Sequence, residues 1–346
     1  MQLDARKMRI LQAIIDDYIL TATPVGSRTI AKRSDIGLSP ATIRNEMADL
    51  EELGYLEQPH TSAGRVPSDK AYRLYVNSIM QRAKLSDAEV RYIRDHYSRR
   101  LDEVDEVVKQ TAWVLSSLTK YASMVLAPQL HAIKLKYIHL VPIAEDKALA
   151  IIVTDAGMTR DSIIRIPPGM KQDALEHLGR ALTTRFSECR LDEITQAQFN
   201  ELSGEVAQQR EFFDAMMQSL RRSMTQRGRN VELSGATNIL NYPEYSDMER
   251  ARALLTAIEE KDMLYRVLTE ATNVEFSVRI GSENEDESIR DCSVVTATYK
   301  IGANPIGSFG VIGPTRMDYA HVLAMLGLIG KSLSEVLTNM FEEERK

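Results

Sequence analysis

The sequence has few residues that could cross-link the chain or hold a metal ion. It contains only two cysteines, Cys189 and Cys292, which lie far apart and have no cysteine or histidine beside them at ligand spacing. Its six histidines are equally scattered, and no two are four residues apart as in a helical zinc site. We therefore expect no disulfide framework, no metal and no cofactor, and a reducing cytoplasm is the simplest location.

Long apolar runs are missing as well. No stretch of eighteen consecutive apolar residues occurs, and the first nine residues carry three basic side chains without the apolar core of a signal peptide. We expect no contact with a membrane.

The sequence also lacks the motifs of common enzymes. Gly307, Gly310 and Gly313 recur every third residue rather than as a dinucleotide-binding GxGxxG pattern. The Gly-Lys-Ser triplet at residues 330–332 lies in an apolar helical pattern and lacks the first glycine of a P-loop. We interpret these glycines as structural. No catalytic triad or acid–base pair stands out, and we predict that the protein is not an enzyme.

Charge is unevenly distributed along the chain. The formal net charge is −6, yet residues 1–82 hold eleven basic and ten acidic side chains, whereas residues 83–346 hold 32 basic and 39 acidic ones. The acidity therefore lies outside the N-terminal part, which is close to neutral. If that part binds nucleic acid, its affinity must come from a few well-placed cations and from two copies acting together.

The N-terminal part reads as three helices. The first spans about residues 4–20, where apolar side chains recur every three or four residues and Asp4 can cap the start. A connection around Pro24 follows, and Ser27 is expected to cap a second, short helix.

The third helix has the clearest boundaries in the sequence. Ser39 is its expected N-cap, Pro40 occupies the first helical position and Gly54 follows its last residue. Apolar residues form its inward face, and small, hydroxyl, guanidinium and amide side chains occupy the opposite side of its first two turns. Such side chains suit a major groove, where Arg pairs with guanine and Asn with adenine.

A wing follows this helix. The pattern consists of a short strand at residues 55–57, a turn-rich tip and a second strand at Val66. The tip carries side chains that can contact the sugar-phosphate backbone of DNA. The sequence therefore predicts a winged helix-turn-helix in residues 1–82 that binds double-stranded DNA. The expected DNA-binding residues are Ser27, Arg28, Ser39, Ala41, Thr42, Arg44, Asn45, His60, Thr61, Ser62 and Arg65.

Winged helices also serve as docking units between proteins, so three helices alone do not establish contact with DNA. Arg44 in isolation is weak support. The polar outward face, the cationic wing and the helix start agree with one another, and this agreement favours DNA binding.

These residues resemble the signature of the heat-inducible transcription repressor family, HrcA. The likeness is carried by residues 38–47 (LSPATIRNEM), 50–56 (LEELGYL) and 60–67 (HTSAGRVP), and it continues in residues 306–319 (IGSFGVIGPTRMDY). The resemblance implies a homodimeric repressor of chaperone operons that binds an inverted-repeat operator, the CIRCE element, and leaves it on heat shock. It also implies that chaperonin supports the active repressor, and that the protein is cytoplasmic and joins the nucleoid when bound to its operator.

The resemblance further implies the fold class: an α+β multidomain chain with an N-terminal winged helix-turn-helix and a GAF-like α/β domain that carries an inserted dimerising α+β segment. We expect a DNA-binding domain at residues 1–82, a connecting helix at 83–105 and the GAF-like domain at 106–346, interrupted at roughly residues 137–226. As an alternative, the GAF-like domain senses a small molecule. The sequence shows no recognisable ligand pocket, and we expect no such ligand.

The pattern beyond residue 82 alternates between helix and strand. Residues 85–124 read as helical, with a charged and solvated first half. Three antiparallel strands are expected near residues 137–143, 147–154 and 162–166.

Three further helices are expected at about residues 172–187, 196–204 and 206–226, and the Phe and Met side chains of the last two favour a subunit interface over a cofactor pocket. In the last third of the chain the sequence predicts two helices, a β-hairpin that turns at residues 302–305 and a long final helix.

Overall fold

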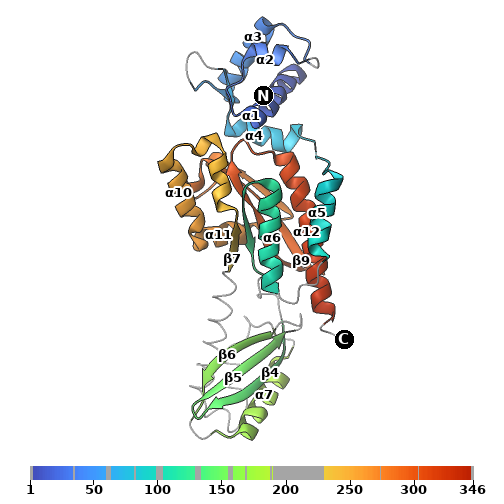
Figure 1. Cartoon of the computed structure of the whole chain (residues 1–346), viewed down its shortest axis with the longest axis vertical. Helices are drawn as coiled ribbons and strands as arrows, with labels where there is room; N and C mark the ends of the chain where they lie inside the picture. The colour runs from blue at the N-terminus through green and yellow to red at the C-terminus, as the bar shows by residue number, and fades with distance from the viewer. Residues whose placement is uncertain are drawn as a thin grey trace.

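The computed structural model describes residues 3–33, 36–59, 64–81, 83–98, 104–128, 134–154, 159–167, 170–187, 189, 230–272, 274–302 and 304–343. They form three parts along one long axis (Figure 1). Small helices lie at one end, a five-stranded sheet in the middle and a three-stranded sheet at the other end.

The N-terminal part is a winged helix-turn-helix, as the sequence predicts. It comprises α1 (Ala5–Thr21), α2 (Ser27–Ala31), α3 (Pro40–Glu52) and the antiparallel strands β1 (Leu56–Glu57) and β2 (Val66–Pro67). Asp4 caps α1 as expected, because its carboxylate accepts a hydrogen bond from the Lys7 amide at 2.7 Å. The cap predicted at Ser27 is wrong: Gly26 takes the N-cap position without a side-chain bond, and Ser27 is the first helical residue.

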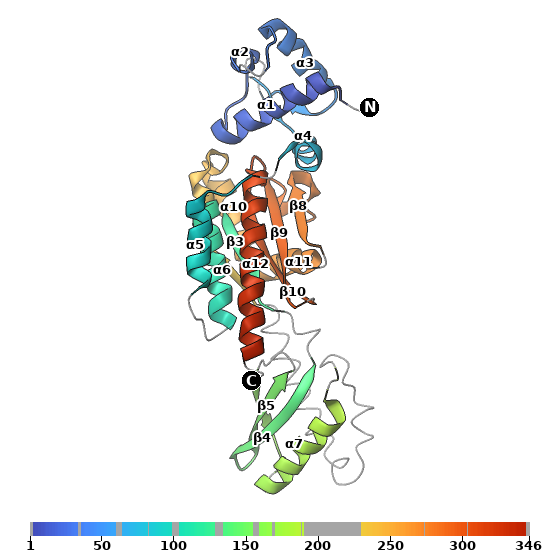
Figure 2. The same ribbon diagram turned by 90° about the vertical axis from the view of Figure 1, so that its right-hand side faces the viewer.

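The middle part is an antiparallel sheet with helices on both faces. Its strand order is β7-β3-β10-β9-β8, with β3 (Ala122–Leu126), β7 (Val231–Ser234), β8 (Phe276–Ile280), β9 (Cys292–Ile301) and β10 (Asn304–Pro314). One face is covered by α6 (Val104–Thr119) and α12 (Tyr319–Glu343), the other by α10 (Met248–Glu259) and α11 (Lys261–Ala271) (Figure 2). Neighbouring residues of β3 point to opposite faces, Val125 toward α6 and α12 and Met124 toward α10 and α11.

Two of these strands escaped the sequence analysis. The helix expected to reach residue 124 ends at Thr119, because Lys120 adopts a left-handed φ of 61° and β3 begins at Ala122. The other missed strand, β7, has four residues and is too short to show an alternating pattern. The hairpin expected at residues 302–305 is confirmed, since β9 ends at Ile301 and β10 begins at Asn304.

The third part is a three-stranded sheet with one covering helix. The strands β4 (Leu135–Ala144), β5 (Lys147–Thr154) and β6 (Thr159–Arg165) are antiparallel, which confirms the expected trio, and α7 (Gln172–Phe186) packs on one face. This sheet lies at the far end of the molecule from the winged helix (Figure 1). The two helices expected at residues 196–226 lie outside the described residues.

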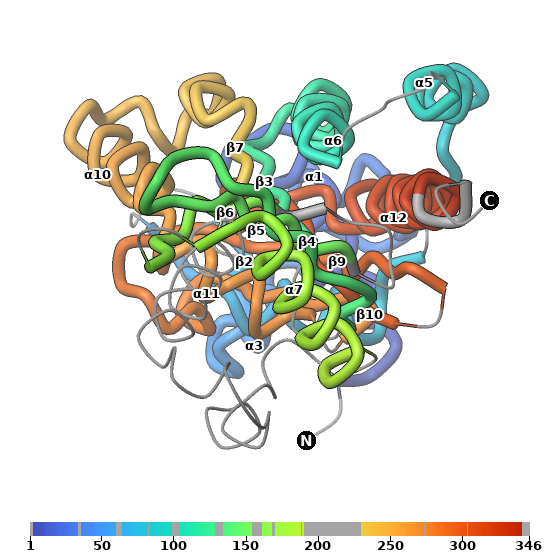
Figure 3. Tube along the Cα trace, turned by 90° about the horizontal axis from the view of Figure 1, so that it is seen from below, coloured from blue at the N-terminus to red at the C-terminus, as the bar shows by residue number. Residues whose placement is uncertain are grey.

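The chain leaves the winged helix through α4 (Asp69–Leu74) and a π-helical turn, η1 (Tyr75–Ile79), and then forms α5 (Asp87–Tyr97). Seen along the long axis, α5 lies at the rim beside α6 and α12 (Figure 3). The expectation that this stretch is simply solvated is wrong. Ile93 and Tyr97 are buried, and the Tyr97 hydroxyl donates a hydrogen bond of 2.8 Å to Thr111 of α6.

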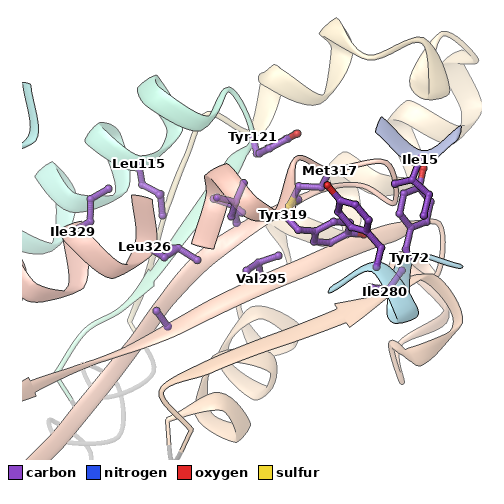
Figure 4. Packing of buried hydrophobic residues seen from close by; sticks show 14 of the residues in the cluster. Ile15, Tyr72, Leu115, Tyr121, Ile280, Val295, Met317, Tyr319, Leu326 and Ile329 are labelled. Atoms are coloured by element: carbon purple, nitrogen blue, oxygen red, sulfur yellow. The ribbon is translucent and has the colours of Figure 1, made fainter. Parts of the chain in front are cut away.

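One hydrophobic cluster runs from the winged helix into the sheet (Figure 4). It includes Ile15 of α1 and continues through Tyr72 of α4 to Tyr319 at the start of α12. The ring centroids of Tyr72 and Tyr319 lie 6.0 Å apart. The Tyr319 hydroxyl bonds to Ser293 at 2.6 Å and donates to the Thr315 carbonyl at 2.5 Å. The winged helix is therefore packed onto the body through a shared core.

By length and composition α12 could span a membrane, and among the described helices it alone could. Its position in the fold accounts for its apolar character, because its buried residues recur every three or four positions along the face that meets the sheet. They are Val322, Met325, Leu326, Ile329, Leu333 and Leu337. We interpret α12 as a core helix.

We predict that Tyr319→Phe lowers the free energy of unfolding by about 1 to 3 kcal/mol, because the buried Ser293 hydroxyl and Thr315 carbonyl lose a partner. Tyr72→Phe is the matched control. The Tyr72 hydroxyl is buried in the same cluster and has no hydrogen-bond partner among the described residues, so its removal should leave stability unchanged or raise it. Urea unfolding of both variants measures the difference, and equal losses would contradict this account.

Candidate nucleic-acid interface

The helix α3 is held in place by its caps and by its buried face. The Ser39 hydroxyl accepts a hydrogen bond from the Thr42 amide at 3.1 Å, and Pro40 occupies the first turn. Ile43, Met47 and Leu50 are buried against the other helices of the module, as the sequence predicts. The opposite side of the helix start is therefore fixed toward solvent.

The predicted base-reading residues share that outward side. Ala41, Arg44 and Asn45 are exposed, and the structure shows no hydrogen bond or ion pair for the side chains of Arg44 and Asn45 with any described residue. Thr42 is half-buried, and its hydroxyl lies 2.9 Å from that of Ser39. An arginine and an amide that are free, adjacent and at the start of a helix suit the edges of bases.

The short helix α2 contributes less than expected. Arg28 is exposed, whereas Ser27 is only 9% exposed, so the Ser27 hydroxyl does not share the surface formed by the outward residues of α3. Lys32, just after α2, is an exposed cation that the sequence analysis did not single out.

The base of the wing is anchored to α3. Arg65 donates from Nε to Glu51 at 2.8 Å, and its Nη2 lies 2.7 Å from the same carboxylate. Its backbone exchanges two hydrogen bonds of 2.9 Å with Val25. The Arg65 guanidinium, which we expect to contact DNA, therefore also fixes the position of the wing. Gly64, the preceding residue, lies so close to the Val25 backbone that a side chain would not fit there. The predicted tip residues His60, Thr61 and Ser62 lie outside the described residues.

Two of the acidic residues of α3, Glu46 and Asp49, are paired with basic residues of α1. The Lys7 ammonium lies 2.8 Å from Glu46 and 2.9 Å from Asp49, and the hydrogen bond that it donates to Glu46 is the main reason that the pKa of Lys7 is raised. Arg6 lies 3.5 Å from Glu46 as well. Sequence reasoning missed these partners because they join positions about forty residues apart. Their effect is to limit the negative charge next to Asn45.

The body offers no competing chemistry within the described part of the chain. No cluster of His, Cys, Asp or Glu there could hold a metal ion. Burial raises the pKa of the Cys292 thiol to about 11, which makes it a poor nucleophile. The glycines of β10 allow close packing, because a side chain at Gly307 would overlap Tyr299 and one at Gly310 would overlap the Val295 carbonyl.

A polar cleft of about 790 Å³ lies between the winged helix and the body. Lys70 and Glu57 line it from one side, and Arg250, Arg290 and Asp291 from the other. The mixed charges select no ligand class, and the cleft defines no chemical site.

Two family models match the chain. Residues 2–80 match the winged helix-turn-helix transcription repressor, HrcA DNA-binding model, and residues 105–323 match the HrcA protein C-terminal domain model. Similar curated proteins include the heat-inducible transcription repressor HrcA of Brevibacillus brevis, 42% identical over 341 residues, which cover 99% of this chain and 100% of that protein. The HrcA of Pelotomaculum thermopropionicum is 42% identical over 339 residues and covers 97% of each chain.

A crystal structure of a hypothetical protein shares the fold, with a TM-score of 0.63 and 24% identity over 98% of this chain and 100% of that one. The chain therefore belongs to the HrcA family, and it is a heat-inducible, DNA-binding transcription repressor.

Proposed function

We propose that two copies of this chain bind an inverted-repeat, CIRCE-like operator upstream of chaperone genes and leave it on heat shock. In this proposal each α3 enters one major groove, and the two-fold axis of the dimer matches the symmetry of the operator. The observation that carries it is the pair Arg44 and Asn45, exposed and unengaged within the described part of the chain. Repression follows from occupation of the site that polymerase needs.

The proposed contacts divide by type. Arg44, Asn45 and Thr42 read bases, Ala41 allows the helix to approach the groove, and Arg28 and Ser39 contact phosphate near the helix start. The wing residues His60, Thr61, Ser62 and Arg65 contact the sugar-phosphate backbone. A module with nearly balanced charge gains little from nonspecific attraction, so this reading requires two copies on one operator.

We further propose that the three-stranded sheet is part of an inserted dimerising segment at roughly residues 137–226 within a GAF-like domain. The face of this sheet opposite α7 carries a group of exposed apolar side chains, with Tyr137, Ile143 and Ile163 all at least 45% exposed. Cross-strand pairing places Ile163 beside Leu149, and Leu149 beside Val141, so these side chains form a continuous apolar surface. A second copy of the same face is the occupant that would bury it with two-fold symmetry.

Chaperonin support and loss of repression on heating are proposed from membership of the family. In this proposal the dimer is marginally stable, and unfolded protein in a heated cell competes for the chaperonin. The regulator then loses its active form when chaperones are most needed.

We predict that Arg44→Ala weakens operator binding by about 1 to 3 kcal/mol and relaxes base preference at one position in each half-site. Lys32→Ala is the control, because loss of an exposed cation near phosphate weakens binding to all sequences alike. The measurement is titration of duplexes that the wild-type protein selects from a random library, with single-base variants. Unchanged affinity and base preference in Arg44→Ala would rule out its proposed role.

Replacing Ile163 by Asp should weaken self-association at least about tenfold, since a charge at the centre of an apolar interface stays unpaired when buried. Met248→Asp is the control, because Met248 is 79% exposed on α10, far from this sheet. Sedimentation equilibrium measures the change. A dimer that survives Ile163→Asp unaltered would place the interface elsewhere.

We expect purified repressor to lose operator binding after a cycle of heating and cooling, and to regain it when chaperonin and ATP are present. Fluorescence anisotropy of a labelled operator before and after the cycle gives the result. Full recovery without chaperonin would contradict the proposed heat response.

A further inference from the structure

Arg316 joins the body directly to the first helix of the DNA-binding module. It lies in the segment between β10 and α12, and its side chain is only 11% exposed. Its Nη1 donates a hydrogen bond of 2.8 Å to the carbonyl oxygen of Ile19, in the last turn of α1.

This bond completes the end of a helix that has no basic residue of its own there. The last four carbonyls of an α-helix lack partners within the helix, and a cation near them offsets the negative end of the helix dipole. In α1 the last turn contains no basic side chain, and Ala22 ends the helix with a left-handed φ of 54°. The body therefore supplies the cation that α1 lacks.

The Arg316 side chain is held on both sides. Glu244, in the 3₁₀ turn η5 (Pro243–Tyr245), accepts hydrogen bonds from Nε and from Nη2, the latter at 3.2 Å. The guanidinium lies 5.5 Å from the ring centre of Tyr242, which stacks on Tyr121 at 5.3 Å. The planar guanidinium can make these bonds to Glu244 and to Ile19 in only one orientation. The bonds therefore fix the position of Ile19 relative to the sheet.

A second polar contact joins the module to the body through α4. Asp69 accepts hydrogen bonds from the Ser282 amide at 2.8 Å and from its hydroxyl at 2.9 Å. Arg73 forms an ion pair with Glu283 and donates to the Val278 carbonyl at 2.6 Å. Burial raises the pKa of Glu283, but the hydrogen bonds from Arg73 and from the Ile280 amide outweigh it and leave that pKa lowered.

We infer that Arg316 is a positioning residue for operator binding, and that Glu244 orients it. The contact at α1 and the contact at α4 hold the module at two places, with the Tyr72–Tyr319 packing in the same junction. The first helix in turn holds α3 through Lys7 and Glu46. Arg316 therefore contributes to where the outward face of α3 points relative to the rest of its own subunit, together with the α4 contact and the tyrosine packing.

This inference rests on the proposed binding of a dimer to an inverted repeat. When two sites are joined in one molecule, the second binds with an effective concentration that depends on how well the joint geometry matches the spacing of the targets. A module fixed at the right angle binds both half-sites at one spacing, and a loosened module binds them more weakly and tolerates other spacings. Contacts within one half-site do not depend on this angle.

The test compares Arg316→Met with the wild-type full chain on three probes. They are the inverted repeat that the wild-type protein selects from a random duplex library, a duplex with one half-site, and duplexes whose half-sites are moved together or apart by one or two base pairs. Methionine keeps an apolar stem over Tyr242 and removes the fork. Arg279→Met is the matched control, because Arg279 forms its ion pair with Glu270 at 2.7 Å inside the body.

For Arg316→Met we expect affinity for the selected repeat to fall about tenfold or more, with half-site affinity changed less than about twofold and a flatter dependence on spacing. Glu244→Gln should change affinity and spacing in the same direction by a smaller amount, since the bond to Ile19 remains. It also serves as the test if Arg316→Met does not fold. Arg279→Met should match the wild type.

Two results would overturn the inference. One is an Arg316→Met protein that binds the selected repeat with wild-type affinity and spacing preference. The other is an equal loss on the half-site and on the repeat, which would show a role in the stability of the module alone. If the wild-type protein selects no inverted repeat, the proposed function itself fails, and this inference fails with it.

Discussion

The packing of Tyr72 against Tyr319 connects the DNA-binding module to the rest of the chain. Tyr72 belongs to α4, which follows the wing, and Tyr319 opens α12, which packs along the five-stranded sheet. Because both rings are buried in one cluster with residues of α1 and β9, neither side can shift without exposing apolar surface of the other. The orientation of α3 thus depends on the sheet, although α3 itself does not contact it.

The charge distribution also indicates that the module contacts DNA and that the body orients the module. The module is nearly neutral, and Arg6 and Lys7 of α1 are paired with acidic residues of α3. The exposed outward cations, Arg28, Lys32 and Arg44, are few and lie near the starts of α2 and α3 or just after α2. We therefore expect one copy to have little general affinity for DNA, and specificity to be favoured over nonspecific attraction. In the proposed mode of binding, the acidic body contributes to DNA binding by orienting the module, and its charge does not attract DNA.

Much of the fold was predictable because local signals matched the final structure. The helix α3 begins after Ser39, at Pro40, and ends before Gly54, as predicted. The strands β4 and β5 and the β9–β10 hairpin lie close to their expected positions. The strand β3 was missed because a single left-handed residue, Lys120, separates it from a long helix with similar apolar content. The strand β7 has four residues and carries too little pattern to be recognised.

The candidate site was predictable only where it is local. The sequence indicates which side chains of α3 point outward, but it does not show that Arg65 is paired with Glu51 or that Lys7 neutralises Glu46, because both pairs depend on tertiary packing. The bond from Arg316 to Ile19 joins residues almost three hundred positions apart, and no periodicity reports it. Such long-range contacts are what connect the body to the DNA-binding surface.

Native-state hydrogen exchange tests the dependence of the module on the body most directly. If the shared core makes them one cooperative unit, the slowest amides of α1, around Ile14, and of β10, around Val311, should open with the same free energy. Tyr319→Phe should lower both by the same amount. A lower opening free energy for α1 that Tyr319→Phe leaves unchanged would show that the winged helix folds independently, and would contradict the account.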